Sequence, residues 1–204
     1  MPRHASSPPT SILVAVVALA FGPTTAAALV RKDFNEPTPD EAGLFGPHFR
    51  VPLLSVDNGA TVAEVQMQLA ITPQEQHHGL MFKRSLDKDT GMLFLYDTPE
   101  QRVLWMKNTY VPLDAAWFTT NAVMQEVQHL KPQDLTYRWS TSQDISMGLE
   151  MPGGWFESKK IAPGTVQLDR KALAAAIAQR GFKPAEFLGE GAGQTDAPAQ
   201  QDKQ

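Results

Sequence analysis

The chain has 204 residues, a formal net charge of −4 and no cysteine. This length suits one domain with tails better than two domains, and the lack of cysteine excludes disulfides, zinc thiolate sites and thiol catalysis. Because the net charge is negative and no run of basic residues is longer than the pair Lys159-Lys160, nucleic acid is not an expected partner.

The first 28 residues have the organisation of a secretory signal peptide. A short segment with Arg3 precedes the apolar run at 12–21, and Ala26 and Ala28 form a small-residue cleavage site. The apolar run is shorter than the roughly 20 residues of a membrane-spanning helix. We therefore expect export to the periplasm or the extracellular space, no transmembrane segment after cleavage, and a mature chain that starts near Leu29.

The next segments predict a linker followed by a sheet. Residues 29–60 are rich in Pro, Gly and Asp, which predicts a linker, an edge strand at 50–56 and a turn at Asp57-Asn58-Gly59. Apolar and polar residues then alternate in EVQMQLAI, whereas GMLFLY and VLWM are apolar on both faces. DAAWF and VMQEVQHL flank TTNA, a short hairpin connection. The pattern predicts a mainly β domain over 61–187, a compact antiparallel sandwich or jelly-roll-like barrel.

One or two short peripheral helices are expected to accompany the sheet. The first begins at Thr72 with a capping box formed by Glu75, and Gly79 ends it. The second has Asp169 as its N-cap and Gly181 just after its end. Residues 188–204 are expected to form a disordered tail.

The common catalytic and cofactor-binding motifs are absent from the sequence. It has no G-x-S-x-G elbow, no H-E-x-x-H motif, no phosphate-binding loop and no dinucleotide fingerprint. The adjacent His77-His78 pair cannot ligate one metal ion in the ordinary way, because neighbouring helical residues point about 100° apart. We therefore expect no metal and no cofactor, and the sequence leans away from an enzyme.

The segment WMKNTYVPLD at 105–114 places polar residues between apolar flanks, and two interpretations stay open. If the segment continues a strand, Trp105 and Lys107 share one face and Asn108 lies on the other. In the structural interpretation, a bend returns Asp114 toward Lys107 or Arg84 as a compensated ion pair. In the functional interpretation, Trp105, Lys107 and Asn108 form a pocket floor for a small anionic or hydroxyl-rich ligand.

Several segments together resemble the family catalogued as domain of unknown function 192. They are GLMFKRSL (79–86), GMLF (91–94), WMKNT (105–109), PLD (112–114) and LEMPGGW (149–155), and the resemblance runs from about residue 62 to 168. It implies a compact, mainly β domain that is commonly exported in bacteria, with no established activity. Either Lys83 or Arg84 fills the family's arginine position, and residues 131–147 diverge. The family's motif positions fall on Gly79, Leu80, Met81, Arg84, Gly91, Met92, Phe94, Trp105, Met106, Lys107, Asn108, Thr109, Pro112, Leu113, Asp114, Glu150 and Gly154.

Glu150 completes the candidate site. It lies between Leu149 and Met151, so strand alternation directs it away from both, toward the face expected to carry Lys107. The sequence favours a binding or accessory module for a small ligand or an envelope protein. The alternatives are an envelope-associated hydrolase that uses Asp114 and Glu150 with Lys107, and a purely structural interaction domain. The candidate ligand-binding residues are Arg84, Trp105, Lys107, Asn108, Asp114 and Glu150.

Overall fold

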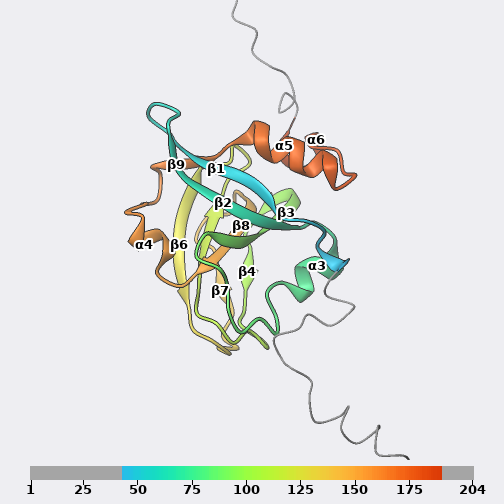
Figure 1. The fold of residues 1–204 in the computed structure, drawn as a ribbon, viewed down its shortest axis with the longest axis vertical. Coiled ribbons are helices and arrows are strands. Elements are labelled where there is room, and N and C mark those ends of the chain that lie inside the picture. The colour runs from blue at the N-terminus through green and yellow to red at the C-terminus, as the bar shows by residue number, and fades with distance from the viewer. Residues whose placement is uncertain (1–42, 190–204) are drawn as a thin grey trace, which may run out of the picture. The chain divides into compact units, whose positions relative to one another are not determined.

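The computed structural model describes residues 43–189. The expected signal peptide and the tail after Gly189 lie outside the described residues. Within them the chain forms a curled seven-stranded sheet, a two-stranded ribbon and short helices (Figure 1). The elements of the large sheet are β1 (Phe49–Ser55), β2 (Thr61–Ala70), β3 (Thr90–Glu100), β5 (Leu113–Phe118), β6 (Met124–Leu130), β8 (Ile145–Pro152) and β9 (Val166–Leu168).

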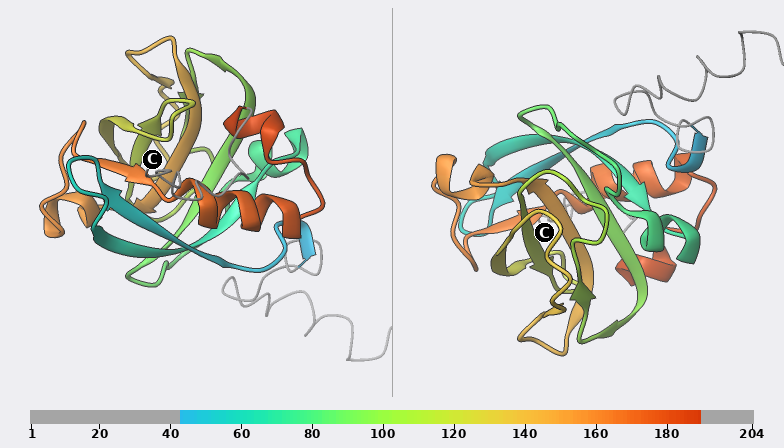
Figure 2. Two further views of the ribbon diagram at one scale, coloured as in Figure 1. Left: turned by 90° about the horizontal axis from the view of Figure 1, so that it is seen from above. Right: turned by 90° about the horizontal axis from the view of Figure 1, so that it is seen from below.

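The strands of the large sheet follow the order β6-β5-β8-β3-β2-β1-β9. Neighbours are antiparallel except β2 and β3, which run parallel because helix α3 (Pro73–His78) and a long loop connect them. The sheet curls until Val123, beside β6, forms a bridge with Gln167 of β9 (Figure 2). The mainly β fold is therefore confirmed, with one parallel pair that the spacing of the strands did not predict.

The first core lies inside the curl of the sheet. All seven strands contribute buried side chains to it, which is possible only because both ends of the sheet approach each other. Helix α5 (Arg170–Gln179) closes one side by burying Leu173 and Ile177, and the short helices α4 (Trp155–Ser158) and α6 (Ala185–Leu188) add further apolar residues. α6 was not predicted, and its last residue, Leu188, is buried.

The second core lies on the opposite face of β3, β5 and β8. It contains Met92 and Phe94 of β3 with Leu113 and Trp117 of β5. The loop after α3 covers it with Leu80. The ribbon of β4 (Val103–Leu104) and β7 (Arg138–Trp139) covers it with Leu104, and Met106 follows from the turn just after β4. Both faces of the central strands are thus buried, as the apolar run GMLFLY predicted. The same prediction for VLWM is wrong, because this run lies on the ribbon, where Leu104 and Met106 are buried and Val103 and Trp105 are only partly buried.

Most of the caps and turns predicted from the local sequence are present in the structure. Thr72 and Glu75 make the capping box of α3, and the side chain of Asp169 accepts hydrogen bonds at the start of α5. β5 and β6 form the predicted hairpin. The prediction of an edge strand near 50–56 is wrong, because β9 pairs with β1 on its outer side. That pairing depends on a segment more than 100 residues later, which local sequence cannot reveal.

At Gly91, β3 lies too close to β8 to leave room for a side chain. A Cβ atom at this position would overlap the backbone oxygen of Glu150 and the sulfur of Met151. Because the obstacle includes backbone of a paired strand, it cannot move away without disrupting the ladder between Met92 and Glu150.

Substitution Gly91→Ala should therefore destabilise the domain by about 2–3 kcal/mol, which lowers the thermal midpoint by roughly 4–12 °C. The matched control is Gly43→Ala, because nothing lies within 4 Å of the Cβ added there. Thermal unfolding followed by circular dichroism measures both variants. Equal midpoints for the two variants would show that the strands tolerate the extra methyl group.

Candidate functional site

The polar residues of WMKNTYVPLD lie in a loop and not on a strand. The β4–β7 ladder ends at Leu104, and the chain then turns, with the Thr109 amide donating to the Met106 carbonyl at 3.1 Å. Asn108 sits in the turn with a positive φ of 55°. The prediction that alternation continues through Lys107 and Asn108 is therefore wrong, because the segment loses its strand partner.

Asn108 holds this loop against the GLMF segment. Its backbone carbonyl accepts a hydrogen bond from the Phe82 amide at 2.7 Å, and its side-chain nitrogen lies 4.0 Å from the sulfur of Met81. Nearby, the guanidinium of Arg84 lies 4.8 Å from the centroid of the Tyr110 ring. Two motifs that are distant in the sequence are thus packed together, and Asn108 has a structural role in that contact.

The ribbon of β4 and β7 has one buried face and one exposed aromatic face. Leu104 and Met106 point into the second core. On the outer side, the rings of Trp105 and Tyr137 lie 5.8 Å apart, and Trp139 pairs with Val103. We call Trp105, Leu135, Tyr137 and Trp139 the aromatic face. Leu135, Tyr137 and Trp139 are 62%, 59% and 53% exposed.

A cation and a rigid turn border the aromatic face. The exposed Lys107 places its ammonium 5.0 Å from the centroid of the Trp105 ring. Asp134 accepts hydrogen bonds from the Thr136 amide and from Arg138, each at 2.9 Å. The backbone bond from Thr136, followed by its side chain and Arg138, lowers the pKa of Asp134 to about 2. The turn that carries Leu135 and Tyr137 is therefore held by a carboxylate that stays ionised.

Asp114 does not pair with a lysine or arginine as the structural interpretation expected. Its carboxylate lies fully buried on β5, and one oxygen is 2.7 Å from Nδ1 of His129 on β6, its cross-strand neighbour. The side chain of His129 is 71% exposed. The other Asp114 oxygen is buried without a hydrogen-bond partner in the described part of the chain. Asp114 thus orients an exposed imidazole and does not compensate Lys107.

Asp114 and Glu150 lie on opposite faces of the sheet. In the β5–β8 ladder, Glu150 pairs with Ala115, whereas Asp114 pairs with Met151. Adjacent strand positions point to opposite faces, so Glu150 extends into the second core and Asp114 toward the first. The carboxylate pair required by the predicted hydrolase is therefore not formed, and that alternative is contradicted.

Glu150 lies in the second core and not beside Lys107, where the sequence predicted it. It is 4% exposed, and burial raises the pKa of its carboxyl to about 8, so the group is largely protonated at neutral pH. Burial also raises the pKa of Tyr96, and the charge of Glu150 adds to this while Arg102 opposes it. The Arg102 guanidinium lies 3.9 Å from the centroid of the Tyr96 ring. Glu150 thus shares the second core with Tyr96.

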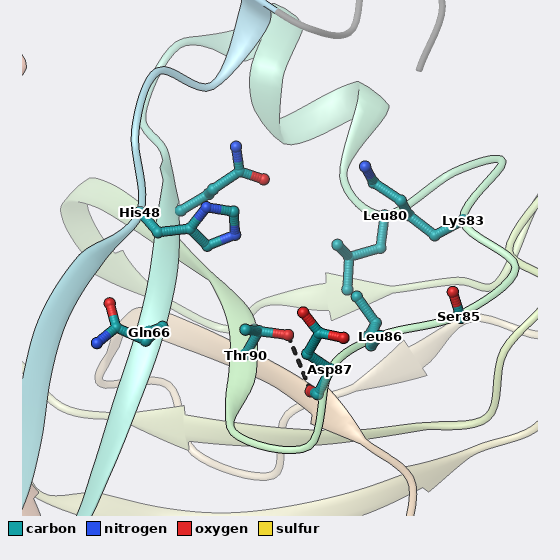
Figure 3. A pocket seen from close by; sticks show the side chains of 10 residues that line it. His48, Gln66, Leu80, Lys83, Ser85, Leu86, Asp87 and Thr90 are labelled. Atoms are coloured by element: carbon teal, nitrogen blue, oxygen red, sulfur yellow. Dashed lines mark hydrogen bonds between the residues drawn. The ribbon is translucent and has the colours of Figure 1, made fainter. Parts of the chain in front are cut away.

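A pocket of about 420 Å³ lies apart from the aromatic face. It is formed by His48, by β2, by the loop at 80–87 and by the start of β3 (Figure 3). None of the candidate residues predicted from the sequence lines it, although the GLMFKRSL motif supplies one wall. Among the described residues, no group of three or more His, Asp or Glu side chains is arranged to hold a metal ion.

Residues 54–167 match the family model DUF192, described as "Uncharacterized ACR". The chain belongs to this family. The resemblance inferred from the GLMFKRSL, WMKNT and PLD motifs is therefore confirmed, and the family brings no established activity.

Two crystal structures are similar to this member of DUF192. One is of a candidate transcription regulator from Sinorhizobium meliloti 1021, with 28% identity over 59% of this chain and 92% of that chain and a TM-score of 0.55. The other is of a protein of unknown function from Novosphingobium aromaticivorans, with 26% identity over 62% of this chain and 88% of that chain and a TM-score of 0.55. No curated protein matches significantly. In the described part of the chain, no helix has the length and apolarity to span a membrane.

Substitution Glu150→Gln should remove a pH-dependent cost of folding. The folded carboxyl has a pKa of about 8 and the ordinary value is 4.5. Between these two pH values the folded state therefore binds more protons than the unfolded state. As a result, the free energy of unfolding of wild type falls as pH rises from about 4.5 toward 8. The free energy of unfolding of the variant minus that of wild type should therefore increase by about 1 kcal/mol per pH unit between pH 5 and 8.

Urea unfolding at pH 5, 6.5 and 8 measures this difference between variant and wild type. The matched control is Glu64→Gln on the exposed surface of β2, which should leave the pH profile nearly parallel to that of wild type. Parallel profiles for Glu150→Gln as well would contradict a buried, protonated carboxyl.

Proposed function

We propose that this DUF192 member is an exported binding module that recognises a partner protein through the aromatic face. The observation that carries the proposal is that three large apolar side chains, Leu135, Tyr137 and Trp139, are more than half exposed within five residues at the start of β7 and in the turn before it. Clustered exposed apolar residues mark interaction surfaces, whereas single ones are common on any protein.

The composition of the face matches what protein interfaces use. Tyr and Trp are enriched among the residues that contribute most to binding, because they supply a large contact area with few rotatable bonds. The ribbon is held from behind by Leu104 and Met106 and at its turn by the Asp134–Arg138 ion pair at 2.9 Å. A surface positioned in this way loses little conformational entropy when a partner binds.

The charge beside the face indicates the chemistry of the partner. Lys107 is exposed and lies against the Trp105 ring, so its ammonium stands at the edge of the apolar surface. A partner segment that presents a carboxylate next to proline or another apolar side chain complements this arrangement. A protein segment suits the aromatic face, because exposed Tyr and Trp side chains supply the large contact area that protein interfaces use.

The sequence supports a location outside the cytoplasm for the proposed function. Residues 1–28 have the organisation of a signal peptide. We therefore propose that the partner is an envelope or extracellular protein in a bacterium.

A peptide library displayed on phage and selected against the mature chain from Leu29 to Gln204 tests the proposal. Enriched peptides should combine an acidic residue with apolar residues or proline. Tyr137→Ala and Trp139→Ala should each weaken the best peptide by roughly 30-fold, equivalent to about 2 kcal/mol. Lys107→Glu should weaken it by roughly tenfold through charge repulsion.

The matched control is Val62→Ala, an exposed apolar residue at the start of β2 and outside the aromatic face. It should leave peptide affinity unchanged. Because the aromatic side chains are more than half exposed, their truncation should cost less than about 1 kcal/mol of stability, which thermal unfolding verifies. Peptides that bind equally well to the Tyr137 and Trp139 variants would refute the aromatic face as the binding surface.

A further inference from the structure

The pocket beside β2 contains two opposite charges that no residue of the described chain neutralises. Figure 3 shows the Lys83 ammonium and the Asp87 carboxylate directed toward the space beside His48. Neither side chain forms a hydrogen bond or an ion pair with another described residue. Elsewhere on the surface, opposite charges do pair, as between Lys159 and Asp89 at 3.0 Å. The pocket thus holds a cation and an anion apart.

Neutral polar groups complete the polar side of the pocket. The Gln68 amide nitrogen donates to the Gly46 carbonyl at 3.0 Å, which fixes the side chain and leaves its oxygen as an acceptor. Burial, followed by the charge of Lys83, lowers the pKa of His48, while Asp87 acts in the opposite sense. The imidazole is therefore neutral near pH 7 and can both donate and accept.

The remaining wall is apolar and rigid. Leu80 is buried in the second core, and Leu86 packs against that core from the same loop. The Thr90 hydroxyl donates to the Asp87 carbonyl at 2.9 Å and so fixes the turn that carries the carboxylate. A volume of about 420 Å³ is within the range of small-molecule sites and suits a ligand with a short aliphatic part.

The two charges select against ligands of a single sign. A simple anion attracted by Lys83 is repelled by Asp87, and a simple cation attracted by Asp87 is repelled by Lys83. A molecule with both a carboxylate and an ammonium group satisfies each charge. We propose that this pocket binds a small zwitterion, an α-amino acid with an aliphatic side chain, with its carboxylate on Lys83, its ammonium on Asp87 and its side chain against Leu80 and Leu86.

Isothermal titration of the mature chain with leucine tests this proposal, with two analogues that each lack one charge. These are 4-methylpentanoate, which has no ammonium group, and 3-methylbutylamine, which has no carboxylate. Leucine should bind at least about tenfold more tightly than either analogue. No binding of leucine at millimolar concentration, or equal affinity for leucine and one analogue, would overturn the proposal.

Three substitutions assign the roles of the two charges. Lys83→Met should lower the affinity for leucine by at least about tenfold and should raise the affinity for 3-methylbutylamine. Asp87→Asn should lower the affinity for leucine and should raise the affinity for 4-methylpentanoate. Lys88→Met, on the same loop but outside the pocket, is the matched control and should change none of the three affinities.

Folding of each variant is checked by its thermal midpoint, which should stay close to wild type because both charges are solvent-accessible and unpaired. Leucine affinity that is unchanged in folded Lys83→Met and Asp87→Asn would overturn the proposed site. The residues tested here are separate from the aromatic face, so failure of this proposal and failure of peptide binding are distinguishable.

Discussion

Burial of both faces of the central strands is the constraint on which the rest of this structure depends. Every residue of β5 is buried, and the same holds for β8 as far as Met151. Each polar side chain on these strands must therefore enter one of two cores, and strand alternation decides which. This is why Asp114 and Glu150, which share a ladder, meet different neighbours: Asp114 reaches His129, and Glu150 enters the second core near Tyr96.

The second core also determines what the outer surface presents. Because the sheet cannot leave Met92 and Trp117 exposed, two segments must cover them, the loop after α3 and the β4–β7 ribbon. Each covering segment has an inner apolar side and an outer side that is free to carry function. The ribbon turns Tyr137 and Trp139 outward, and the loop brings Lys83 and Asp87 to the pocket. Both proposed binding surfaces are therefore outer sides of elements whose inner sides stabilise the fold.

Much of the fold and little of the candidate site could be predicted from the sequence. The capping box at Thr72, the N-cap at Asp169 and the β5–β6 hairpin depend on a few neighbouring residues, and all three are confirmed. The pairing of β1 with β9 and the parallel pairing of β2 with β3 depend on distant segments and were missed. Of the predicted site residues, Trp105 and Lys107 do lie together, but Tyr137 and Trp139 beside them were missed, since that segment departs from the family motifs. The alternation of Tyr137 and Trp139 was the signal that could have indicated their shared face.

The sequence by itself determined the family, the mainly β class and the local helix and turn signals, because motif order, alternation and capping are properties of neighbouring residues. Only the tertiary structure decided which polar groups meet. Asp114 pairs with His129 and not with Lys107 because β6 is its neighbour in the sheet, and Glu150 is directed to the opposite face by one step of strand register. Contacts of this kind depend on the alignment of strands that are far apart in the chain, and a shift of one residue exchanges the two faces.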